Sequence, residues 1–145
     1  QVYESIVRES AVSKSVTGTE KLEFDPRIAD FAWEAVKSAG FLRAVLMPRF
    51  MDVLLNQPAA ANRFFLTAAI VAEDMRSMKD FASVGFDDCS DYVLLGHEAR
   101  CECFEYYLHA YKGGRVIAKM HEQEELDRLN VQGAALIASK AKLFV

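Results

Sequence analysis

The sequence feature that most constrains the fold is a helical period of apolar residues that continues along most of the chain. The stretch DPRIADFAWEAVKSAG, residues 25–40, shows this period most completely. Asp25 is a residue type that caps helix N-termini, Pro26 suits a first helical turn, and Gly40 is typical of a helix end. Between them, the spacing i, i+3, i+4, i+7, i+8 of a buried stripe is filled by Ile28, Phe31, Ala32, Ala35 and Val36.

The same period predicts helices along the rest of the chain. Pro48 is expected to kink the helix over 41–57, and Pro58 and Gly85 are expected to bound the longest one. A further helix is expected to begin at a cap on Ser90 or Asp91 and to end at Gly113–Gly114. The remaining helices are expected over 2–15 and 115–143, the latter as one helix or two, with 17–25 as an extended tether.

These patterns predict an all-α fold, an irregular bundle of five to seven helices. No strand alternation or hairpin turn signal stands out. A length of 145 residues is that of a single domain, residues 1–145, in which 1–25 form a peripheral N-terminal helix and tether.

Charge and composition argue against several classes of protein. The net charge is −4 and no Lys/Arg cluster occurs, which disfavours nucleic acid and anionic membrane surfaces as partners. No apolar run reaches the roughly 18 residues that span a bilayer. The odd count of three cysteines favours a reducing, intracellular compartment. Because the chain begins with Gln1 rather than Met, no organelle is assigned.

The stretch HEARCECFEYYLHAY, residues 97–111, concentrates the residues that could carry chemistry. On a helix that begins near Tyr92, the apolar side carries Cys103, with Cys101 at the edge of the polar side. The opposite side is acidic, and we expect it to face solvent or a partner; it consists of Glu98, Glu102, Glu105 and His109.

A metal site is the alternative interpretation of this stretch. Its ligands would be His97, Cys101, Glu105 and His109, which are four residues apart, with His121 from another helix. Side chains four residues apart on a helix differ in direction by about 40°. The four side chains therefore cannot all point at one ion. The metal-binding patterns H-E-x-x-H, E-x-x-H and C-x-x-C are also absent. No cofactor is therefore expected.

The thiols give no indication of catalysis. Acidic neighbours should raise the thiol pKa of Cys101, and Cys103 should be buried and inert. No catalytic residue is assigned, and an enzyme is not expected.

Adjacent apolar residues favour an interaction role. Pairs such as Phe64–Phe65 and Tyr106–Tyr107 place apolar side chains on two sides of one helix. The candidate interaction residues are Trp33, Phe64, Glu98, Glu102, Glu105, His109 and Phe144. We expect a non-enzymatic helical protein that binds protein, as a homo-oligomer or a small subunit of a larger assembly.

The alternative function is a helical bundle, with or without enzymatic activity, that binds a metal or a small-molecule ligand. It would use carboxylate and imidazole groups of residues 97–109 and 121–125. In either case the core is expected to contain Phe31, Ala32, Val36, Leu46, Phe65, Ala69, Ala72, Met75, Ala99, Cys103 and Tyr107.

Overall fold

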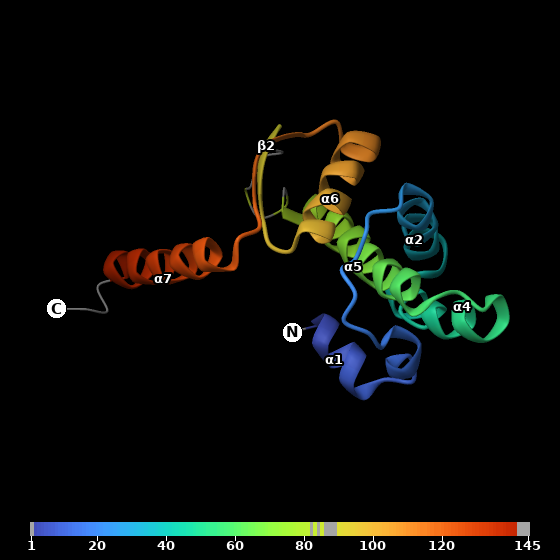
Figure 1. The fold of residues 1–145 in the computed structure, drawn as a ribbon. Coiled ribbons are helices and arrows are strands. Elements are labelled where there is room, and N and C mark those ends of the chain that lie inside the picture. Colours follow the sequence, from blue (N-terminus) through green and yellow to red (C-terminus); the bar gives the residue numbers. More distant parts are fainter. Residues whose placement is uncertain (1, 82, 84, 86–89, 142–145) are drawn as a thin grey trace.

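A computed structural model describes residues 2–81, 83, 85 and 90–141 of the chain. The chain is mostly helical, at 71%, which confirms the predicted fold class in its coarse form. One small sheet of two parallel strands lies within the described residues and was not expected from the sequence. The helices gather around a long central helix, and one helix extends away from them (Figure 1).

Helix α2, Pro26–Ala39, begins and ends where its capping residues predict. The Asp25 carboxylate accepts a hydrogen bond from the backbone N–H of Arg27 at 2.9 Å. Gly40 has φ 84°, a conformation that favours glycine, and its N–H donates to the carbonyl of Val36. The helix buries Ala29, Ala32 and Val36 against the rest of the chain.

Near Pro48 the chain forms two separate helices rather than the single kinked helix that the sequence predicts. Helix α3, Phe41–Ala44, is a single turn, and α4, Met47–Leu55, begins with Pro48 in its first turn. Asn56 then ends α4 in a left-handed conformation, with φ 51°. The two helices bury Ala44, Val45, Pro48 and Met51 on one side.

Helix α5, Ala59–Phe81, forms the centre of the molecule. It contacts α2, α3, α4 and α6, and also the N-terminal segment. Because it is covered on several sides, its apolar residues are buried around much of its circumference. The buried set is Phe64, Phe65, Leu66, Ala68, Ala69, Val71, Ala72 and Met75.

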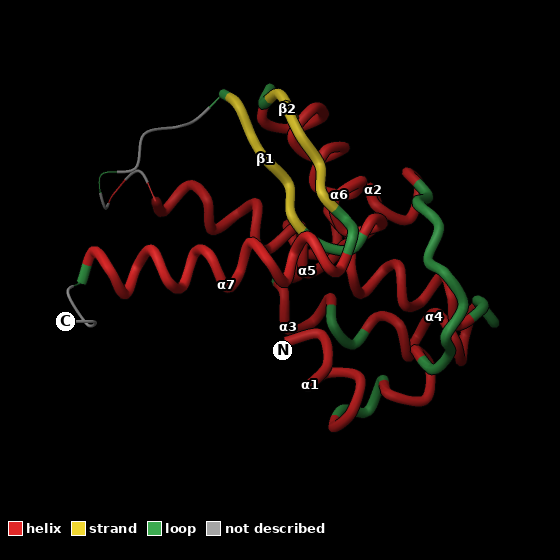
Figure 2. The backbone as a smooth tube through the Cα atoms, turned by 60° about the vertical axis from the view of Figure 1, so that its left-hand side comes forward, coloured by secondary structure: helices red, strands yellow, loops and turns green. Residues whose placement is uncertain are grey.

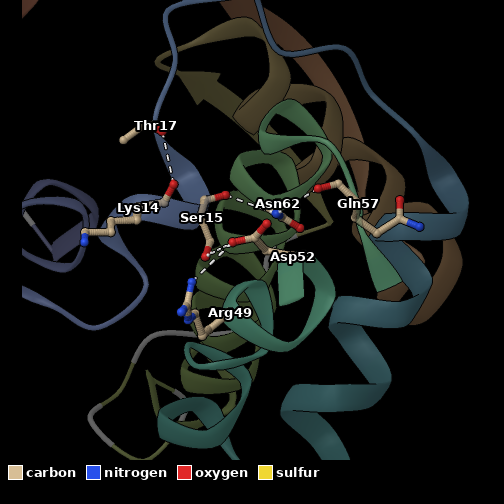
Figure 3. A network of polar contacts seen from close by, with 7 residues as sticks. All are labelled: Lys14, Ser15, Thr17, Arg49, Asp52, Gln57 and Asn62. Atoms are coloured by element: carbon tan, nitrogen blue, oxygen red, sulfur yellow. Dashed lines mark hydrogen bonds and ion pairs between the residues drawn. The ribbon is translucent and has the colours of Figure 1, made fainter. Parts of the chain in front are cut away.

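The N-terminal segment is joined to α4 and α5 by polar contacts (Figure 3). It consists of α1, Val2–Glu9, and a 3-10 turn η1, Ser13–Val16. The Ser15 hydroxyl donates to the Asp52 carboxylate at 2.7 Å, and the Asn62 side-chain amide donates to the Ser15 carbonyl at 3.1 Å. Residues 17–25 then cross the surface without helix or strand, as predicted.

The predicted helix over residues 91–113 is partly wrong. Residues Asp91–Leu95 form strand β1, which pairs in parallel with β2, Arg115–Met120 (Figure 2). Between the strands lie α6, Glu98–Tyr107, and the π turn η3, Leu108–Lys112. Neither Ser90 nor Asp91 caps a helix; His97 precedes α6 instead. The predicted helix end at Gly113 is confirmed, with φ 76°.

Local features of the sequence explain why the helical spacing did not predict the two strands. Gly96 has φ 142°, which separates β1 from α6 although Tyr92, Leu95 and Ala99 fit a helical spacing. Apolar runs as short as β1 fit either period. In β2, exposed and half-buried residues alternate along the strand, which is the period of a sheet.

Helix α7, Gln123–Lys140, occupies the later part of the expected 115–143 helix. It follows β2 directly and runs away from the remainder of the chain (Figure 1). None of its residues is buried. This helix therefore makes no contribution to the core within one chain.

Most of the predicted core is confirmed. Ala32, Val36, Phe65, Ala69, Ala72, Met75, Ala99, Cys103 and Tyr107 are all buried. Two predictions are wrong, because the side chains of Phe31 and Leu46 are 43% and 45% exposed. Phe31 borders a surface groove beside α4, and Leu46 lies on the outer side of the α3–α4 segment.

Candidate interaction surfaces

The acidic side of α6 is neutralised partly from within the chain. The Glu98 carboxylate lies 2.7 Å from the Lys21 ammonium of the tether, and Glu105 lies 2.6 Å from the Lys119 ammonium of β2. The hydrogen bond from Lys21 lowers the pKa of Glu98, and the hydrogen bond to Glu105 raises the pKa of Lys119. Glu102 is half-buried, and His109 is exposed on η3.

This arrangement changes the expectation for the acidic residues. The sequence predicts that they face solvent or a partner, and two cations opposite them, Lys21 and Lys119, belong to the same chain. The ion pairs tie α6 to the tether on one side and to β2 on the other. Contact of these residues with a partner stays a prediction.

The residues of the alternative metal site do not converge. Within the described part of the chain, no three His, Cys, Asp or Glu side chains lie close enough together to hold an ion. His97 is exposed beside the start of α6, while the Nδ1 atom of His121 lies 3.3 Å from the carbonyl oxygen of Gly96. Cys101 is buried below that same carbonyl.

The position of Cys101 corrects its expected place at the edge of a polar side. Only 2% of the residue is exposed, because the turn at Gly96 covers it, and its thiol donates to the Gly96 carbonyl at 3.6 Å. Burial raises the pKa of the Cys101 thiol, and burial raises the pKa of Cys103 to about 12. Both groups are therefore protonated at neutral pH and poor nucleophiles. Cys89 lies outside the described residues.

Aromatic side chains from α2, α6 and η3 form a cluster around Trp33. The Trp33 ring stacks on Tyr111 with a centroid distance of 4.1 Å and an interplanar angle of 4°, and it contacts Tyr107 at 5.0 Å. The hydroxyls of Tyr106 and Tyr111 both donate to one oxygen of Asp30, at 2.8 and 3.0 Å. Burial and this bond raise the pKa of Tyr111 to about 12.

This cluster gives Trp33 a packing role within the chain. The residue is half-buried, so part of it remains available at the surface. Its assignment as an interface residue stays a prediction. Phe64, by contrast, is 1% exposed and packs edge-on against Phe24 at 5.8 Å. Phe64 is therefore removed from the candidate surface, and Phe144 lies outside the described residues.

A run of exposed apolar side chains lies on α3 and α4, and its member Leu46 was predicted to belong to the core. Five residues on the outer side of α3, α4 and their junction are exposed by 45% to 82%, and we call them the α3–α4 apolar stripe: Leu42, Leu46, Phe50, Val53 and Leu54. Within α4, the i, i+3, i+4 spacing of Phe50, Val53 and Leu54 places them on one face. Arg43 and Arg49 are exposed beside them.

The sequence of α3 and α4 carries a signal for this stripe. The segment 42–54 carries apolar residues on two sides, since Ala44, Val45, Pro48 and Met51 are buried while the stripe is not. Helices at the edge of a small bundle have one side that faces the core. A second apolar side on such helices is therefore not covered by another element of the chain. On α5, by contrast, the second apolar side is covered by neighbouring helices.

An open groove of about 340 Å³ adjoins α4 on its inner edge, lined in part by Phe31, Met51 and Leu55. A second open hollow of about 500 Å³ lies between the tether and the first turns of α2 and α5. Neither is lined by the residues of the acidic stretch 97–109.

Comparisons with protein-family models, with curated proteins and with solved structures find no match for this chain. None of the helices that the structure describes has the length and apolar character needed to traverse a bilayer. The exposed surfaces are therefore the features from which a function can be argued.

Proposed function

We propose that this chain is a non-enzymatic interaction protein that binds another protein surface through the α3–α4 apolar stripe. The single observation that supports this proposal is the exposure of five large apolar side chains on α3, α4 and their junction, three of which share one face of α4. Scattered exposed apolar residues are ordinary, whereas a contiguous apolar helical face is typical of a docking surface.

The residue types of the stripe are those expected of a protein-binding surface. Phe50 is its aromatic member and Leu42 its most exposed, at 82%. Aromatic and arginine side chains are enriched where interfaces gain most of their binding energy. Arg43 is exposed next to Leu42, and Arg49, next to Phe50, pairs with Asp52 at 3.4 Å, so a partner with an acidic residue near Arg43 fits best.

The test is to replace Phe50 and Val53 by glutamate together and to compare binding with the unaltered protein. Light scattering over a range of concentrations would report self-association, and affinity capture from extracts of the native source would report other partners. Because both side chains are more than half exposed, the double variant should keep the far-UV circular dichroism of the unaltered protein.

We expect the affinity of the double variant for its partner to be lower by about tenfold or more. The variant Val131→Glu, which alters an apolar residue on α7 that is 70% exposed, serves as the control. Equal binding by both variants and the unaltered chain would contradict the proposal.

A further inference from the structure

Helix α7 needs a partner that the single chain does not supply. Its 18 residues have no buried member within the single chain. Most helical stability in proteins comes from packing of an apolar face. The sequence of α7 carries such a face, and within one chain that face meets nothing that buries it (Figure 1).

The apolar face of α7 has the spacing of a coiled-coil seam. Its members follow one another at intervals of three, four and three residues, and we call them the α7 seam: Leu126, Leu129, Gly133 and Leu136. Ile137, 69% exposed, lies beside the seam. Val131, 70% exposed, lies about 200° from Leu129 and so points to the opposite side.

We infer that α7 pairs in antiparallel orientation with α7 of a second copy of this chain, forming a two-fold symmetric dimer. The inference rests on the proposed function as an interaction protein and names one of its partners. A two-fold axis makes the same surface serve on both sides, so a self-complementary face is required. The α7 seam meets this requirement in both shape and charge.

Shape complementarity fixes the register. When Leu126 lies opposite Leu136 of the second copy, Leu129 lies opposite Gly133 of the second copy. The two leucine side chains then fill the spaces left by the two glycines. Within one chain a Cβ at Gly133 would contact nothing within 4 Å. A mid-helix glycine costs about 1 kcal/mol relative to alanine, and close packing against Leu129 gives it a role.

Charge complementarity selects the antiparallel orientation. The first turns of α7 and the residue before them are acidic, with Glu122, Glu124, Glu125 and Asp127, whereas Lys140 is its last residue. In the same register, Glu122 lies opposite Lys140 of the second copy, and the helix dipoles oppose one another favourably. A parallel pair would place acidic turns side by side and would set Gly133 against Gly133.

The first test compares Leu129→Glu with Val131→Glu by sedimentation equilibrium over a range of chain concentrations. Neither substitution can disrupt the core, because no α7 side chain is buried within one chain. We expect Leu129→Glu to raise the dimer dissociation constant by about tenfold or more. The matched control, Val131→Glu, should leave it unchanged.

The second test exchanges charges at the two ends of α7. Lys140→Glu alone should weaken the dimer by about two- to fivefold at low salt, because two glutamates would then face one another. Adding Glu122→Lys should restore the affinity of the unaltered chain in an antiparallel pair. In a parallel pair the second substitution would give no recovery, which would overturn the proposed orientation.

The outcomes separate this inference from the proposed function. A chain that is monomeric at every concentration would overturn the α7 pairing. Binding through the α3–α4 apolar stripe is tested separately, by the double variant of Phe50 and Val53. A dimer that Leu129→Glu leaves intact would also overturn the pairing. A dimer lost with Leu129→Glu, kept with Val131→Glu and restored by the charge exchange supports it.

Discussion

The phenolic oxygen of Tyr107 lies 2.6 Å from the backbone carbonyl oxygen of Ala29, and this buried hydrogen bond joins α6 to α2. Tyr107 is fully buried, so the bond forms where water cannot replace it. The same hydroxyl lies 3.5 Å from the carbonyl of Ala68 on α5. A single side chain thus links the three helices that enclose the core.

Replacing Tyr107 by phenylalanine should lower the free energy of unfolding by about 1 kcal/mol, since it removes this bond and little volume. Urea denaturation followed by circular dichroism measures the change. Tyr92→Phe is the matched control, because the Tyr92 hydroxyl has no hydrogen bond within the described residues. Equal effects of the two substitutions would mean that the Tyr107 bond adds nothing to stability.

The sequence predicted those parts of the fold that are determined locally. Asp25 and Gly40 bound α2 because capping acts within one helical turn. The strands were missed because β1 and β2 are defined by pairing between segments more than 20 residues apart, which local spacing does not encode. Gly96 was the one local signal of a break.

The candidate surfaces were predicted less well, for a related reason. Whether an apolar side is buried depends on which helix covers it, and this is a tertiary property. Phe64 is covered although its helix has two apolar sides, while Phe50 is exposed although its spacing fits a core helix. Glu98 is exposed on α6, and its ion-pair partner Lys21 comes from a segment with no regular structure, which helical spacing cannot predict.

The buried thiol of Cys103 predicts a loss of stability in alkali. Its pKa is about 12 in the folded chain against 9.0 for a free thiol, because burial disfavours the thiolate. Between about pH 9 and pH 12 the unfolded chain releases this proton while the folded chain keeps it. The stabilisation is therefore complete below about pH 9 and is lost as the pH rises through this window. Burial of Tyr107, which raises its pKa, acts in the same direction.

Urea denaturation at a series of pH values should show this decline in the free energy of unfolding. In Cys103→Ala, the slope of the free energy of unfolding against pH should correspond to the release of about one proton fewer on unfolding. The slope is the readout, since the smaller side chain also lowers stability at every pH. An unchanged slope in Cys103→Ala would show that this thiol does not contribute.

The buried guanidinium of Arg63 holds the tether against α5. It donates to the carbonyl oxygens of Gly18 and of Glu20, the latter at 2.6 Å, and to the Glu20 carboxylate at 2.9 Å. Arg63→Met removes these bonds and should lower the free energy of unfolding by about 2 kcal/mol. It should also speed cleavage after Glu20 and Glu23 by a glutamate-specific protease.

A second arginine on the same helix provides the control for this prediction. Arg76 pairs with Glu73 at 2.9 Å, and its side chain is 48% exposed. Arg76→Met should change the free energy of unfolding by less than about 0.5 kcal/mol and leave cleavage of the tether unaltered. Similar cleavage rates in the two variants would show that the tether is held by other contacts.

Gly114 begins the segment that leads into β2, and its lack of a side chain lets the Tyr92 ring pack across the sheet. A Cβ at this position would lie 2.5 Å from Cε2 of Tyr92 and 3.2 Å from Cδ2 of Leu108. Gly114→Ala should therefore lower the free energy of unfolding by about 1–3 kcal/mol. In the background of Tyr92→Leu, where the ring is absent, the same substitution should cost less, since the two positions are coupled. A double-mutant cycle by urea denaturation measures this coupling, and an equal cost in both backgrounds would show that the ring does not restrict Gly114.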